Sequence, residues 1–114
     1  MRYIAALAVD SNKLMLFDLT ARKWIELAAV PASIANWSRD GKYVYFDSSF
    51  GEPNPAIYRV RVSDRQLEKA VSLNSLRRAW GGWGWWMGLA PDDSPLALRD
   101  VGTQEIYALD VELP

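Results

Sequence analysis

The stretch IYRVRV, residues 57–62, alternates apolar and charged side chains with a period of two. Tyr58, Val60 and Val62 fall on one side of an extended chain and the two arginines between them fall on the other, as in a strand with one buried face. Two other stretches have the same outline, LMLFDL at 14–19 and IYALDV at 106–111. Each opens with Leu or Ile and has large apolar residues at its fourth and sixth positions. The pattern therefore predicts three copies of one strand-forming element.

Each copy belongs to a longer repeated unit. A polar turn follows the first two copies at the same distance, TARKW at 20–24 and SDRQL at 63–67, which predicts a hairpin. An Asp-containing tight turn and a β-prone run come before the later copies, in WSRDGKYVYF at 37–46 and LAPDDSPLAL at 89–98. This comparison places Pro95 at the position of Tyr43. Four short strands per roughly 40–50 residues are typical of β-propeller blades.

The repeat predicts an all-β fold, a partial β-propeller of about two and a half four-stranded antiparallel blades, with almost no helix. An incomplete blade is expected at 1–29, a complete blade at 30–73 and a last blade without its outer strand at 79–114, with 74–78 as the connection. The expected strands are about 2–9, 13–19, 23–28, 33–37, 42–47, 56–62, 67–71, 84–89, 95–99 and 104–111.

The composition excludes several kinds of chemistry. The 114 residues include no histidine and no cysteine, so the most common general base, thiolate nucleophiles and Cys or His metal ligands are missing. Lys and Arg total 13 against 14 Asp and Glu, which argues against nucleic-acid binding. No apolar run approaches the roughly 20 residues of a membrane span. Residues 1–9 fit a strand better than a signal peptide, which favours a cytoplasmic location.

Four of the six tryptophans fall within WGGWGWW at 80–86. Trp80 and Trp83 precede an expected strand on Gly-rich chain, so they are the candidate binding residues, because exposed Trp side chains give large contact areas and stack on sugars. We expect Trp85 and Trp86 to pack between blades.

The other candidate polar groups have structural interpretations. Asp40, Asp92 and Asp93 lie in the repeated turn, where hydrogen bonds to the local backbone account for them without catalysis or a metal. Arg77 and Arg78 are expected in a solvated turn between blades. We therefore expect no catalytic residue, no metal and no cofactor.

The motifs WSRDGK at 37–42 and IYALDV at 106–111 resemble the blade pattern of TolB-like propellers, which are related to WD-type repeats. Residues 88–105 look like the last blade of propellers attached to bacterial winged-helix regulators and serine/threonine kinases. The resemblance implies a non-catalytic interaction module of a larger regulatory or sensor protein. No catalytic residue belongs to the blade pattern, so none is carried over.

Three hypotheses about function follow. The first is a module that binds a protein partner or the missing propeller blades, and the second is a carbohydrate or small-ligand module that uses the Trp80–Trp86 cluster. The third is a gene fragment without an independent function, because Met1 falls inside a turn of the repeat. Incomplete blades leave apolar faces and strand edges open, so we also predict self-association.

Overall fold

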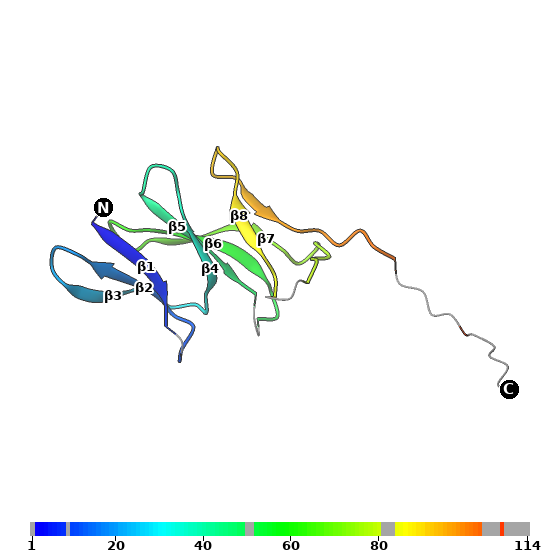
Figure 1. The fold of residues 1–114 in the computed structure, drawn as a ribbon, viewed down its shortest axis with the longest axis horizontal. Coiled ribbons are helices and arrows are strands. Elements are labelled where there is room, and N and C mark those ends of the chain that lie inside the picture. Colours follow the sequence, from blue (N-terminus) through cyan, green and yellow to red (C-terminus); the bar gives the residue numbers. More distant parts are fainter. Residues whose placement is uncertain (1, 9, 50–51, 81–83, 104–107, 109–114) are drawn as a thin grey trace, which may run out of the picture.

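The structure is a computed structural model that describes residues 2–8, 10–49, 52–80, 84–103 and 108 (Figure 1). The described residues form nine strands and no helix. The strands make three antiparallel sheets. The first sheet contains β1 (Tyr3–Leu7), β2 (Leu14–Asp18) and β3 (Lys23–Ala28); the second contains β4 (Ser33–Trp37), β5 (Tyr43–Ser48), β6 (Ala56–Arg61) and β7 (Leu67–Ser72); the third contains β8 (Met87–Leu89) and β9 (Pro95–Ala97).

The all-β, antiparallel and helix-free character predicted from the sequence is confirmed in the described residues. Seven of the observed strands agree closely with the expected ranges, while β8 and β9 are shorter than expected. The expected strand at 104–111 lies outside the described residues apart from residue 108.

The strands β2 and β6, which come from the first two copies of the repeated stretch, have the same neighbours in their sheets. Each pairs with the strand before it and the strand after it in the chain. The residue directly after each of these two strands makes the same kind of hydrogen bond. Leu19 N donates to Arg2 O at 2.8 Å, and Val62 N donates to Lys42 O at 3.0 Å. The two segments therefore occupy separate sheets rather than adjacent strands of one sheet.

The turn between β4 and β5 depends on a carboxylate and a glycine. Lys42 N donates to Asp40 Oδ1 at 3.0 Å, and Gly41 N donates to Ser38 O at 3.0 Å. Gly41 has a φ of +73°, a conformation that glycine adopts without steric cost.

The turn between β8 and β9 has a similar pattern of bonds. Ser94 N donates to Asp92 Oδ1 at 3.0 Å, and Asp93 N donates to Ala90 O at 2.9 Å. In this turn, the two strands are joined at the pair Leu89 and Pro95, so the turn is shorter than the one between β4 and β5.

Trp37 of the second sheet corresponds to Leu89 in the repeat, and it pairs with Val44 and not with Tyr43. The placement of Pro95 at the position of Tyr43 is therefore wrong by one residue, because the second turn is one residue shorter.

Strand β5 of the second sheet is buried on both of its faces. Val44, Phe46 and Val60 lie in a core shared with Leu14 and Leu16 of the first sheet. The opposite face contributes to a second core, made by Tyr45, Ile57, Leu73 and Met87. Strand β4 contacts β1 on one side and β8 on the other, so the three sheets follow one another along the molecule (Figure 1).

Candidate functional site

The strand pairing of the third sheet is interrupted at the Trp-rich segment. Arg78 pairs with Arg99 through an isolated bridge, and Met87 pairs with Ala97 at the end of β9. Only Leu98 separates these two pairing positions on one strand, whereas residues 79–86 separate them on the other. We call the described residues 79–80 and 84–86 the Trp loop.

A buried ion pair holds the base of the Trp loop. Arg78 Nη2 lies 2.7 Å from Asp47 Oδ2 of β5, and the two side chains are only 5% and 2% exposed. The same nitrogen donates to the carbonyl of Trp86 at 3.1 Å, at the other end of the loop. Arg78 Nη1 donates to Ser49 Oγ at 3.1 Å, and this hydroxyl in turn donates to Asp47. One guanidinium thus ties both ends of the loop to the second sheet.

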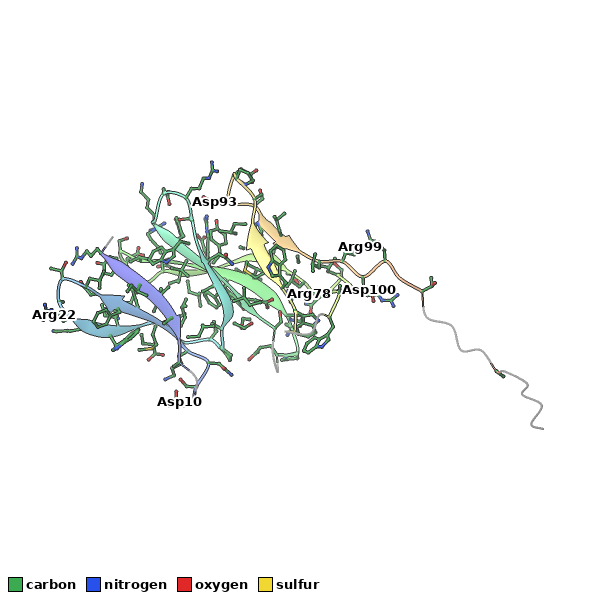
Figure 2. All side chains as sticks on the ribbon, in the orientation of Figure 1. Asp10, Arg22, Arg78, Asp93, Arg99 and Asp100 are labelled. Atoms are coloured by element: carbon green, nitrogen blue, oxygen red, sulfur yellow. The ribbon has the colours of Figure 1, made fainter. Side chains whose placement is uncertain are left out.

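The prediction that Arg77 and Arg78 form a solvated turn is wrong for Arg78. The Arg78 side chain is buried, and its guanidinium lies 5.2 Å from the centre of the Trp85 ring. Arg77 is exposed as predicted and pairs with Asp100 at 3.3 Å. Figure 2 shows Arg78, Arg99 and Asp100 near one another, where the chain leaves β9.

The loop presents tryptophan side chains to solvent. Trp80 is 65% exposed, and its ring packs edge-on against Trp85, with 5.2 Å between ring centres. The same ring lies over Gly84, where a Cβ would be 3.6 Å from it. The Trp80 side chain is therefore largely exposed to solvent, while its ring packs against Trp85 and Gly84. Whether Trp80 binds a ligand stays a prediction, and Trp83 lies outside the described residues.

The prediction that Trp86 packs between sheets is wrong. Trp86 is 46% exposed and lies directly before the first residue of β8, and the Trp86 ring covers Gly88. A Cβ on Gly88 would lie 2.7 Å from the Trp86 ring, so glycine is needed for this packing. Trp85 is half-buried and contacts Trp80 and the Arg78 guanidinium, and its packing between blades stays a prediction.

The turn carboxylates act locally or between turns. Asp40 also accepts a hydrogen bond from Ser38 Oγ at 2.7 Å, and Asp93 accepts one from Arg39 N at 3.1 Å, which joins the β8–β9 turn to the β4–β5 turn (Figure 2). The local roles predicted for Asp40 and Asp92 are confirmed, while the Asp93 side chain reaches the neighbouring turn. In the described ranges, no three acidic side chains gather as a metal site would need.

Acid is expected to weaken the fold through these turns. The pKa of Asp40 is lowered chiefly by the N–H of Lys42, and that of Asp92 chiefly by the Ser94 hydroxyl. A carboxyl with a lowered pKa stabilises the fold fully above its unfolded value of about 3.9, and loses this contribution as the pH falls through the folded value. The urea midpoint should therefore be flat above about pH 5 and decrease below about pH 4.

The control for this prediction is Asp40→Asn, whose amide oxygen still accepts from Lys42 but does not titrate in this range. The acid-induced decrease of the urea midpoint should be smaller in this variant. A midpoint that rises between pH 5 and pH 3 would contradict the prediction.

Comparison with known proteins finds no matching family model, no similar curated protein and no similar solved structure. The described residues include no helix long and apolar enough to cross a membrane.

Proposed function

We propose that the chain forms part of a β-propeller, about two and a half blades, and acts as a non-catalytic interaction module that binds a partner through the Trp loop. The module would belong to a larger regulatory or sensor protein, as the resemblance to TolB-like propellers implies. The observation that carries the proposal is the Trp loop, whose exposed tryptophans are held at both ends of the loop by the buried ion pair of Arg78 and Asp47.

The arrangement of the sheets supports the propeller part of this proposal. Strand β4 lies between β1 and β8, and successive sheets bury apolar residues against each other. Sheets that pack face to face in chain order are what successive blades require.

The Trp loop supports the interaction part. Loops on a rigid scaffold commonly carry binding residues, and tryptophan is enriched among residues that dominate binding energy. The ring of Trp80 is held by Trp85 and Gly84, so little side-chain freedom would be lost on binding.

A capture experiment tests the proposal. The purified chain is immobilised, incubated with an extract of the cells that produce it, and the bound proteins are quantified by mass spectrometry. We expect Trp80→Ala to reduce capture of a specific partner at least about tenfold, the effect of a hot-spot residue.

The matched control is Val71→Ala, because Val71 is 40% exposed but lies on β7 of the second sheet. This variant should capture the partner as the wild type does. Equal capture by wild type and Trp80→Ala would remove the Trp loop from the proposed function.

Carbohydrate binding is a second candidate, favoured by the exposure of both Trp80 and Trp86. Exposed indole rings stack on the apolar faces of sugars. In a tryptophan-fluorescence titration against a panel of oligosaccharides, at least one sugar should shift the emission of the wild type but not that of Trp80→Ala. A panel without any response would reject this candidate.

A further inference from the structure

The first sheet exposes a face that the second sheet buries. In the second sheet, Val44 and Phe46 of β5 and Val60 of β6 face the first sheet and are buried. At the corresponding positions of the repeat, the first sheet has Ile4 and Ala6 on β1 and Phe17 on β2.

These residues lie on the side of the first sheet that points away from the second. Leu14 and Leu16 of β2 pack into the core between the two sheets, so the alternate residue Phe17 faces outward. Ile4 pairs with Phe17, and Phe17 pairs with Trp24, which makes an apolar row across all three strands. The rings of Phe17 and Trp24 are 5.0 Å apart, and Ile4 and Trp24 are exposed. We call this row the leading face.

The third sheet exposes apolar side chains on the side that points away from the second sheet. Met87 of β8 is buried in the core shared with the second sheet, and its partner is Ala97. The intervening pair is Gly88 and Leu96, which therefore points to the other side. Leu96 and Leu98 are exposed there, and the Trp86 ring covers Gly88. We call Trp86, Leu96 and Leu98 the trailing face.

The leading and trailing faces are the two halves of a contact that the chain already makes internally. Between the first two sheets and between the last two, a face of one sheet packs on the opposite face of the next. In the part of the chain that the structure describes, one half of that contact stays uncovered at each end of the row of sheets. Each exposed half is apolar, so covering it removes apolar area from water.

We propose that a second copy of this chain docks head to tail, with the leading face of one copy on the trailing face of the next. The two faces differ, so the contact is heterologous, and it builds either a closed ring or an open chain of copies. A second copy is the occupant that fits, because each copy supplies one face of each kind and the contact repeats an existing one. This inference depends on the face-to-face stacking in the proposed function but does not involve Trp80.

The experiment measures molar mass by light scattering and sedimentation for the full chain over a wide concentration range. The wild type should exceed the monomer mass of 12.9 kDa at high concentration. Trp24→Lys and Ile4→Lys on the leading face, and Leu96→Glu and Leu98→Glu on the trailing face, should each give a monomer. Circular dichroism checks that the variants remain folded.

Mixing the variants identifies the geometry. Trp24→Lys retains an intact trailing face, and Leu96→Glu retains an intact leading face, so an equimolar mixture should form a dimer although each variant alone is monomeric. Val71→Lys is the matched control, because Val71 is exposed on β7 and belongs to neither face. This variant should assemble as the wild type does.

Two results would overturn the proposal: a wild type that stays monomeric at about millimolar concentration, or a Leu96→Glu variant that assembles normally, which would indicate like faces in contact. Trp80→Ala should assemble normally. Loss of partner capture in that variant therefore tests the proposed function separately from the head-to-tail contact.

Discussion

Replacing Asp47 with alanine is expected to lower the free energy of unfolding by about 3–5 kcal/mol. The substitution leaves the Arg78 guanidinium buried without its carboxylate partner, and the Arg78 Nε already has no hydrogen-bond partner among the described residues. An uncompensated buried charge is among the most destabilising changes that a single substitution can make. Guanidinium chloride unfolding, followed by circular dichroism, measures the loss.

The matched control removes a carboxylate from an ion pair near the surface. Arg59 Nε lies 2.6 Å from Glu68 Oε1, but both side chains are partly exposed. Glu68→Ala should therefore cost less than about 1 kcal/mol, even though this distance is as short as that in the buried pair. Equal losses in the two variants would contradict the role assigned to burial.

A double variant separates stability from the organisation of the loop. Asp47→Leu with Arg78→Met replaces the buried pair by apolar side chains, which should restore most of the stability lost in Asp47→Ala. The contact between Arg78 and the Trp86 carbonyl is lost in this variant. The double variant should therefore be stable but should capture the partner less well than the wild type.

The strands could be predicted from sequence because their signals are local. In β6, the alternation of Val60 with Arg59 and Arg61 is complete within one short stretch, and it selects the strand and the face that packs on the first sheet, although Ile57 is buried on the other face as well. The Asp40–Gly41 turn is equally local, because its bonds join residues that are close in sequence.

The ion pair and the Trp loop could not be predicted in this way, because both depend on pairing between distant segments. Asp47 and Arg78 are separated by 31 residues. One signal was present, since Asp47 comes directly after the apolar stretch YVYF at 43–46, within a strand that is expected to be buried. Trp85 and Trp86 suit a strand by propensity, and only the pairing of Arg78 with Arg99 shows that they lie outside one.

Replacing Phe46 with alanine is expected to cost about 3–5 kcal/mol, the loss typical of a large aromatic side chain removed from a core. Phe46 is fully buried between the first two sheets, and its ring lies 5.9 Å from that of Tyr58. The chain offers a matched control in Phe17→Ala, because Phe17 is half-buried on the leading face. Denaturant unfolding of the two variants compares them directly.

The comparison tests the stacking of the sheets, on which both proposals depend. At low concentration, Phe17→Ala should lose much less stability than Phe46→Ala, because none of the other sheets in the described part of the chain covers Phe17. At high concentration, the loss in Phe17→Ala should increase, because a docked second copy would bury Phe17 in the assembly. Equal losses at low concentration would mean that the first two sheets do not pack as described, since only that packing distinguishes the sites of the two phenylalanines.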